Sequence, residues 1–250
     1  MTATLTGFGA GVEDLACGAH WPSGAEAARA LAAAGGAPTA AHNNCSGKHT
    51  GFLALAQQLG VPTAAYTDVD HPVQVEVRAA MEAICTAPLG PPAIDGCSAP
   101  TWPIPLRALA TGFARFGTGD GLAPDHASAA VRLRSAVADH PWYVAGTGRF
   151  CTDVMAATGA RAFVKVGAEG AYTAALPELG LGVALKVEDG AFRAAEVALA
   201  TVLQRLLPDL DLDRFVRPPV TTWRGIVVGE LRPAPDVASA PWADSRGRGN

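Results

Sequence analysis

The stretch from His42 to Gly51 consists of polar, thiol-bearing and glycine residues, in a chain that is 49% hydrophobic. After it, apolar residues recur at helical spacing until Gly60 and Pro62, so we expect a polar turn that opens a buried helix. Free N–H groups at a helix start favour anionic partners such as a thiolate. The thiol of Cys45 therefore lies where such a turn could hold a reactive or metal-binding sulfur.

Lys48 follows Cys45 by three residues, so the two side chains would face the same side of a helix. Only three of the 19 basic residues are lysines. A lysine kept in this turn indicates a need for a nitrogen that can lose its proton, which arginine cannot do in a protein. The spacing fits three interpretations: a thiol activated by the lysine, a shared metal site, or a buried cysteine beside a solvated lysine.

A metal site would need a second polar turn, and one lies at Asp95-Gly96-Cys97. Two soft sulfurs, one amine nitrogen and one carboxylate make an acceptable tetrahedral zinc set. The ligands would be Cys45, Lys48, Cys97 and Asp95. Because 52 residues separate the two cysteines, only the folded chain can bring the two turns together.

Other catalytic and binding templates are not matched by the sequence. Gly47-Lys48 lacks the upstream glycine of a phosphate-binding loop, and Gly146-Thr147-Gly148 lacks the third glycine of a dinucleotide site. The sequence has no Gly-x-Ser-x-Gly elbow and no serine three residues before any lysine. Nucleotide binding and the usual serine-hydrolase centres are therefore not indicated.

Charge and composition limit which classes of partner and which compartment we expect. The formal charge of −4 gives no electrostatic reason to expect nucleic acid or an anionic membrane surface as a partner. No uninterrupted apolar run approaches the roughly 20 residues of a membrane span. Five scattered cysteines fit a reducing compartment, and the start of the chain does not resemble a signal peptide, so we expect a cytoplasmic protein.

The periodicity predicts an α+β fold, with helices first and an antiparallel sheet later. The expected helices span residues 25–34, 52–59, 70–84, 106–116, 127–139 and 191–207. The expected strands are a meander over 162–167, 170–176 and 181–188, and a last apolar strand over 225–231. We expect residues 1–233 to form one domain, with a helical part over about 12–140 and a sheet part over about 141–233. Residues 234–250 are expected to be disordered.

Six motifs occur along the chain in this order: Cys17-Gly18-Ala19-His20-Trp21-Pro22, Asn43-Asn44-Cys45-Ser46-Gly47-Lys48-His49, Asp95-Gly96-Cys97, Gly146-Thr147-Gly148-Arg149, Lys165-Val166-Gly167-Ala168-Glu169-Gly170 and Trp223-Arg224-Gly225-Ile226-Val227-Val228-Gly229-Glu230. Together they resemble the rhizobial-type, or type II, L-asparaginase family. The resemblance covers the chain from Cys17 to about Pro233, and the motif around Cys45 is its most specific part.

The resemblance implies hydrolysis of L-asparagine to L-aspartate and ammonia by a homodimer. It also implies the fold of serine β-lactamases and penicillin-binding proteins, in which an antiparallel sheet is packed by helices beside a helical region. In that family a zinc ion is held by the residues that match Cys45, Lys48 and Cys97. Asp95 matches an aspartate that reaches the metal through water, and Lys165 matches a lysine of the catalytic centre.

The family's nucleophilic Ser-x-x-Lys and its second serine precede the position that matches Cys17, where this sequence has 16 residues. We therefore expect an N-terminally incomplete domain whose asparaginase activity is absent or impaired. Two alternatives remain open. One is a non-catalytic relative that binds zinc and a ligand, and the other is a cysteine amidohydrolase that uses Cys45 with Lys48.

Overall fold

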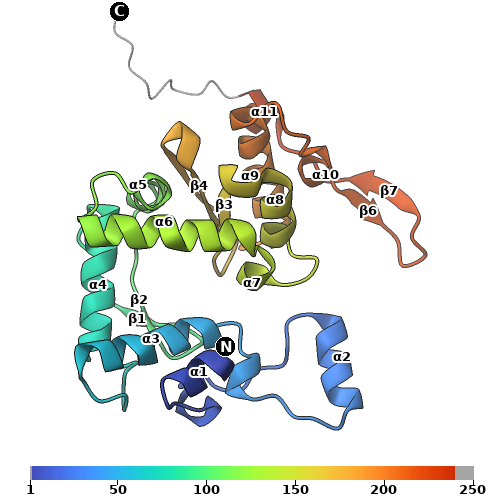
Figure 1. The fold of residues 1–250 in the computed structure, drawn as a ribbon. Coiled ribbons are helices and arrows are strands. Elements are labelled where there is room, and N and C mark those ends of the chain that lie inside the picture. The colour runs from blue at the N-terminus through green and yellow to red at the C-terminus, as the bar shows by residue number, and fades with distance from the viewer. Residues whose placement is uncertain (1, 240–250) are drawn as a thin grey trace, which may run out of the picture. The chain divides into compact units, whose positions relative to one another are not determined.

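The computed structural model describes residues 2–239, and the chain divides into two compact units (Figure 1). The first unit runs from Met1 to Ala108 and the second from Leu109 to Asn250. Helices and small antiparallel sheets make up the described residues, so the protein is of the α+β class. None of the described helices is long and apolar enough to cross a membrane.

Most of the secondary-structure elements of the first unit are helices. Its elements are α1 (Thr2–Gly7), the 3-10 helix η1 (Val12–Asp14), α2 (Ala25–Ala33), η2 (Ala40–His42), α3 (Ser46–Leu59), α4 (Pro72–Cys85), β1 (Ala93–Ile94) and β2 (Pro100–Thr101). A small core joins α1 and α3 to the turn after β1, and it contains Leu5, Leu53 and Cys97. Since Leu5 is only 1% exposed, the short helix α1 is packed against this core.

The helix α3 begins before its apolar pattern does. It starts at Ser46, with Cys45 as its N-cap residue, and ends at Gly60, whose φ of 67° is left-handed. The apolar residues that predict this helix begin only at Phe52, because its first turns carry the polar groups of the motif. Lys48 therefore lies within the first turn of a regular helix, as the three-residue spacing requires.

The second polar turn is the tip of a two-stranded hairpin. Strands β1 and β2 pair in antiparallel register on either side of it. Across the tip, the N–H of Asp95 donates to the carbonyl of Ala99 at 2.9 Å. Ser98 takes a φ of 70°, a left-handed conformation that is uncommon for a residue other than glycine. This compact turn fixes the backbone on which Asp95 and Cys97 stand.

The second unit is a three-stranded sheet with helices on both faces. Its helices are α5 (Leu106–Thr118, whose first residues belong to the first unit), α6 (Pro124–Asp139), α7 (Trp142–Ala145), α8 (Phe150–Thr158), η3 (Gly159–Arg161), η4 (Pro177–Leu179), α9 (Phe192–Leu206), α10 (Asp213–Val216) and α11 (Pro235–Ser239). The strands lie in the order β3 (Phe163–Val166), β4 (Ala171–Leu176) and β5 (Leu181–Lys186), all antiparallel. The predicted meander is confirmed.

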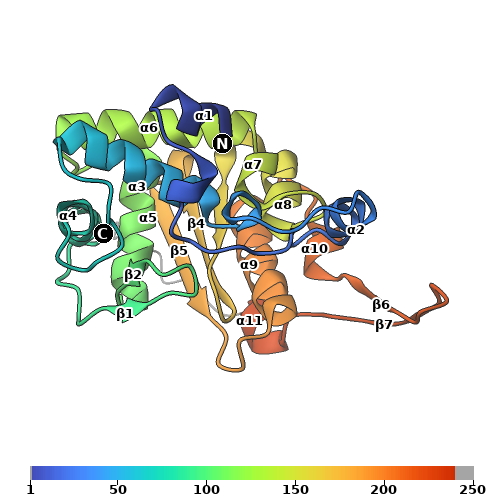
Figure 2. The same cartoon turned by 90° about the horizontal axis from the view of Figure 1, so that it is seen from below.

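Different helices cover the two faces of this sheet, as Figure 2 shows for α5 and α9. Successive strand residues point to opposite faces. On one face, Val164, Tyr172 and Ala174 join the main core with α8 and α9. On the other face, Phe163 stacks on Phe113 of α5, with 6.0 Å between the ring centroids. The sheet is therefore buried on both sides, and its position relative to these helices is fixed within the unit.

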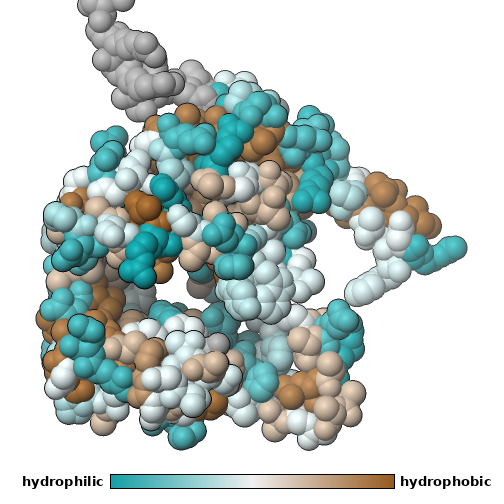
Figure 3. Space-filling view, viewed as in Figure 1, coloured by the Kyte–Doolittle hydropathy of each residue, from teal (hydrophilic) through white to brown (hydrophobic). Residues whose placement is uncertain are grey.

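Two apolar segments are partly exposed. Leu106, at the start of α5, is 46% exposed, because α5 contacts the sheet further along, at Phe113. The predicted strand over 225–231 is confirmed as β7 (Val227–Glu230), which among the described strands pairs with β6 (Pro219–Thr221). Both strands of this ribbon are exposed, and Figure 3 shows hydrophobic residues on its surface.

The boundary between the two units differs from the expected division near residue 140. Helix α6 and most of α5 belong with the sheet, because both contact its strands. At the other end of the chain, residues 235–239 of the predicted disordered tail form the short helix α11. Residues 240–250 of that prediction lie outside the described residues.

Candidate metal centre

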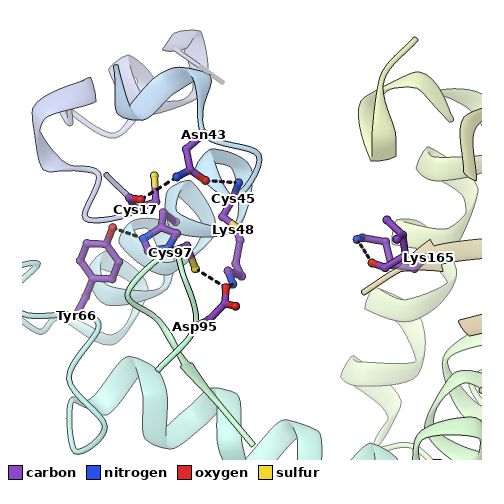
Figure 4. Close-up of polar contacts among 10 residues, drawn as sticks. Cys17, Asn43, Cys45, Lys48, Tyr66, Asp95, Cys97 and Lys165 are labelled. Atoms are coloured by element: carbon purple, nitrogen blue, oxygen red, sulfur yellow. Dashed lines mark hydrogen bonds and ion pairs between the residues drawn. The ribbon is translucent and has the colours of Figure 1, made fainter. Parts of the chain in front are cut away.

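Three side chains of the first unit meet where α3 begins and the hairpin turns. The Sγ atoms of Cys45 and Cys97 and a carboxylate oxygen of Asp95 all lie within 4.8 Å of one another. The Cys97 thiol donates to Asp95 Oδ2 at 3.0 Å (Figure 4). Lys48 Nζ lies 3.9 Å from the same oxygen. The four side chains that the sequence picks out in two separate turns are therefore neighbours.

Asn43 fixes the backbone from which Cys45 projects. Its side-chain oxygen accepts the N–H of Cys45 at 2.8 Å, which is a local turn typical of asparagine. Its amide nitrogen donates to the carbonyl of Cys17 at 2.8 Å and to that of Gly18 at 3.2 Å. Because Asn43 is only 8% exposed, this buried amide ties the first motif of the sequence to the start of α3.

Burial and the charge of Lys48 shift the pKa of the Cys45 thiol in opposite directions. Burial raises the pKa of the Cys45 thiol, and the Lys48 ammonium group partly opposes this rise. The hydrogen bond from Cys97 lowers the pKa of the Asp95 carboxyl group. Metal ligation needs thiolates, so a metal ion that binds here must displace the thiol protons.

The donor atoms fit a zinc ion better than a calcium or magnesium ion, because two of the donors are soft sulfurs. Around a tetrahedral zinc ion with Zn–S bonds near 2.3 Å, two sulfurs lie about 3.8 Å apart. The observed limit of 4.8 Å means that small side-chain rotations would close the set. Lys48 could complete it only as a neutral amine, which a nearby dication favours.

The other cysteines lie outside this set of ligand atoms. Cys17, Cys85 and Cys151 are each at most 3% exposed, which is typical of cysteines that pack in a core. Burial raises the pKa of the Cys151 thiol to about 11 and also raises the pKa of Cys17. A thiol buried in apolar surroundings is a poor nucleophile, so these three cysteines are not candidates for chemistry.

The two histidines of the motif have different surroundings. His42 Nδ1 accepts the N–H of Thr39 at 3.0 Å and so caps the short helix η2. His49 is fully buried, and its Nδ1 lies 2.7 Å from the Tyr66 hydroxyl oxygen. Burial, followed by the Lys48 charge, lowers the pKa of His49 to about 4.

Lys165 lies on β3 of the second unit, directly opposite Thr173 of β4. Its side chain is exposed, and Nζ donates to the carbonyl of Val166 at 2.7 Å (Figure 4). The Thr173 hydroxyl donates to the Lys165 carbonyl at 3.1 Å. Strand pairing thus holds the backbone of Lys165 firmly, while its amine is accessible to solvent.

The family of this chain follows from how many of its residues a family model matches. The family model described as L-asparaginase II matches residues 1–233. The chain belongs to the L-asparaginase II family. Among curated proteins, none matches the sequence. The rhizobial-type resemblance is thereby confirmed, and the match to the L-asparaginase II family contains both polar turns and Lys165.

Two residues near the centre are not found by reading motifs for reactive groups. Asn43 carries no ligand atom for the cluster, although an asparagine two residues before the helix N-cap is a recognisable turn signal. Tyr66 lies outside every motif that resembles the L-asparaginase II family, and no local pattern marks it. Its contact with His49 exists only in the folded unit.

Proposed function

We propose that this member of the L-asparaginase II family acts on L-asparagine, with L-aspartate and ammonia as products, at a site that carries zinc. The observation that carries the proposal is the cluster of two thiols, a carboxylate and a lysine in a chain matched by the family model over residues 1–233. Sulfur, nitrogen and carboxylate donors in this number are typical of a zinc site.

In this proposal Cys45, Cys97 and Lys48 hold the zinc ion, and Asp95 stands beside it. When bound, the ion supplies a positive charge that can orient and polarise a substrate oxygen. The thiols of Cys45 and Cys97 give up their protons on binding, and Lys48 gives up one as well. Asp95 would offer carboxylate oxygens that can accept a hydrogen bond from water.

Lys165 is the proposed catalytic lysine. As a neutral amine it could take a proton from an attacking oxygen, and as an ammonium group it could return that proton to the departing amine. An accessible amine on a strand fixed by pairing with β4 suits this role. The sheet covered by helices on both faces supports the further proposal of a serine β-lactamase-like fold.

The proposed activity is low, because amide hydrolysis needs an oxygen nucleophile with a base beside it. No serine stands three residues before any of the three lysines. Binding of zinc and of asparagine does not depend on that pair. We therefore propose a chain that binds both and turns asparagine over slowly. The cysteine amidohydrolase alternative is less well supported, since burial favours the protonated Cys45 thiol.

The test measures zinc content and asparagine binding separately on the 250-residue protein. We expect about one zinc per chain by elemental analysis, loss of that zinc in Cys97→Ser, and heat released on titration with L-asparagine. The matched control is Cys85→Ser, which removes a buried thiol of the same unit and should keep the zinc. Protein prepared without chelator that holds no zinc would refute the metal site, and absent asparagine binding would refute the substrate.

The proposal also covers the compartment and the oligomeric state of the protein. Five cysteines scattered along the sequence are in keeping with a reducing compartment, so we propose a cytoplasmic location. The family resemblance implies a homodimer. Light scattering on the purified protein tests the dimer, and a mass of one chain at micromolar concentration would contradict it.

A further inference from the structure

His49 has one ring nitrogen without a partner in the middle of a buried region. The residue is 0% exposed, and its Nε2 atom makes no hydrogen bond within the described part of the chain. A buried polar atom without a partner costs free energy comparable to a lost hydrogen bond. Such an atom in a native structure calls for an explanation, and its neighbours supply one.

Tyr66 determines which nitrogen of His49 carries the proton. The Tyr66 oxygen accepts the N–H of Ala16 at 2.7 Å and also lies 2.7 Å from His49 Nδ1. A phenol has one proton to donate, and Nδ1 is the acceptor within reach. If Nδ1–H donated instead, the phenol proton would be left without a use in a buried place. The proton of the neutral imidazole therefore sits on Nε2, the atom without a partner.

Neighbouring groups fix the orientation of Tyr66 and of the histidine ring. Tyr66 is 2% exposed, and its carbonyl accepts the side-chain amide of Gln74 at 2.9 Å. The His49 ring meets the rings of Tyr66 and Phe52 edge to face, with 5.5 Å between centroids in both pairs. The imidazole consequently has one orientation in this core, and its Nε2–H has one direction.

The backbone of Cys97 lies beside the histidine ring. Tyr66, Cys97 and Ala99 belong to one cluster of buried residues, so the tip of the hairpin packs on the same core as the phenol. The turn that carries Asp95 and Cys97 is thus next to an N–H group that is rigid, buried and free to donate. Within the described residues this donor makes no hydrogen bond.

We propose that His49 is a positioning residue of the metal centre, whose Nε2–H holds the backbone of Cys97 while Tyr66 fixes the ring. This inference rests on the proposed function, because the centre that it serves is the proposed zinc site. Groups that orient metal ligands through hydrogen bonds commonly change metal affinity by about 10- to 100-fold when they are removed. His49 would act in this way without touching the ion.

The test compares replacements that separate hydrogen bonding from packing. His49→Leu keeps an apolar side chain in the core and removes both nitrogens. His49→Gln keeps an N–H donor at a similar reach from the backbone. Tyr66→Phe keeps the ring and removes the hydroxyl that orients the imidazole. The matched control is Leu53→Ala, one turn further along α3, which opens a cavity in the same core without removing a polar group.

Zinc affinity is measured by competition with a chromophoric chelator, and ligand geometry by the visible spectrum of the cobalt-loaded protein. We expect His49→Leu to weaken zinc about 10- to 100-fold and to shift the cobalt bands. His49→Gln should stay within a few-fold of the wild type, and Tyr66→Phe should fall between them. Leu53→Ala should melt at a lower temperature yet bind zinc as the wild type does.

The outcomes separate this inference from the proposed function. Wild-type protein that binds no zinc would overturn the metal site and with it the role of His49. Tight zinc binding by the wild type and equally tight binding by His49→Leu would overturn the role of His49 alone. If His49→Leu fails to fold, Tyr66→Phe decides: unchanged zinc affinity and unchanged cobalt bands in that variant would overturn the inference.

Discussion

At the scale of single residues, the side-chain nitrogen of Lys48 could either bind a metal ion or only form an ion pair with Asp95, and a substitution can distinguish these two roles. Lys48 Nζ lies 3.9 Å from Asp95, a contact that an arginine could also make. An arginine cannot become neutral in a protein, so it can pair with Asp95 but cannot bind zinc. We expect Lys48→Arg to weaken zinc binding at least about 10-fold while leaving the melting temperature of the metal-free protein nearly unchanged.

The matched control for this substitution is Lys186→Arg, which changes an exposed lysine at the end of β5. Its zinc affinity should equal that of the wild type, measured by chelator competition. Equal affinity in Lys48→Arg would remove Lys48 from the ligand set and leave it as the ion-pair partner of Asp95.

A substitution of Lys165 can distinguish an effect on activity from an effect on stability. Its side chain is exposed, so Lys165→Met removes little packing and should change the melting temperature by no more than about 2 °C. If its amine handles a proton in the reaction, the residual release of ammonia from asparagine should fall at least about 100-fold per folded molecule. Lys186→Met is the control for loss of a strand lysine. A large drop in melting temperature with activity intact would assign Lys165 to the fold.

The sequence predicts the chemistry of the candidate centre better than its geometry. The spacing of Cys45 and Lys48 already places both on one side of a helix, because a helical turn has a fixed period. The approach of Cys97 depends on a hairpin whose strands have two residues each, too short to show any alternation. Tyr66 and Asn43 act through hydrogen bonds to atoms distant in sequence, and periodicity carries no information about those.

At the scale of elements, Gly182 sets how closely α5 approaches the sheet. A Cβ atom at this position of β5 would lie 1.9 Å from the carbonyl oxygen of Ala110 and 2.5 Å from the nitrogen of Ala114. Both are backbone atoms, which cannot rotate away. Gly182→Ala should therefore destabilise the protein by about 1–3 kcal/mol or more, as overpacking does.

Gly229→Ala is the control for Gly182→Ala, because it also changes a strand glycine, and a Cβ atom there meets nothing within 4 Å. Urea unfolding of both variants checks the difference. If Gly182→Ala unfolds at the same urea concentration as the wild type, the close contact between α5 and β5 is not part of the native fold.

An ion pair joins η3 to the segment after α9. It leads to a prediction about how the stability of the protein depends on pH. Arg161 Nη1 and Nη2 lie 2.5 and 3.0 Å from the two carboxylate oxygens of Asp209. The hydrogen bond from Arg161 lowers the pKa of Asp209 below its ordinary value. A group whose pKa is lowered by folding adds stability above its unfolded pKa, near 4, and loses it as the pH falls through the folded value.

We therefore expect Asp209→Asn to lower the melting temperature slightly at pH 7 and to have no effect near pH 2. The effect is small because the Asp209 side chain is 62% exposed, so solvent screens the pair. Glu188→Gln, a change of another exposed acidic residue, is the control. A difference between wild type and Asp209→Asn that is as large at pH 2 as at pH 7 would show that the ion pair is not its cause.

How well an element is predicted depends on whether its pattern is local. The meander of β3, β4 and β5 follows from glycine-bounded segments rich in β-forming residues, and the structure places each strand within two residues of its predicted ends. The strand β7 has an equally apolar sequence but lies in an exposed ribbon. An apolar run shows that a strand is favourable, and it does not show what covers the strand.

At the scale of the whole molecule, the chain combines a unit that carries the proposed zinc ligands with a unit that carries the proposed catalytic lysine. The candidate metal cluster lies in the first unit, and Lys165 lies in the second. Neither unit by itself holds the full set of groups proposed for the reaction. In the sequence the two polar turns precede Ala108 and the lysine strand follows it.

This division leads to the prediction that the 250-residue chain releases ammonia from L-asparagine only slowly. Zinc held by two thiolates and a lysine has most of its charge neutralised, so it suits the orientation of substrate better than the generation of hydroxide. Efficient turnover would need a nucleophilic oxygen with a base at hydrogen-bond distance. Ser46 stands beside a proposed ligand and two residues before Lys48, which is the wrong spacing for one helical face.

The measurement is ammonia release by zinc-loaded, monodisperse protein at saturating L-asparagine, with Cys45→Ser and Ser46→Ala assayed beside it. We expect less than about one turnover per second, below the range common for enzymes. We also expect no further loss in Ser46→Ala, since Lys48 follows Ser46 by two residues, the wrong spacing for it to activate the hydroxyl. Fast turnover that is abolished by Ser46→Ala would make Ser46 the nucleophile. Fast turnover that is abolished by Cys45→Ser with zinc still bound would instead support the cysteine amidohydrolase.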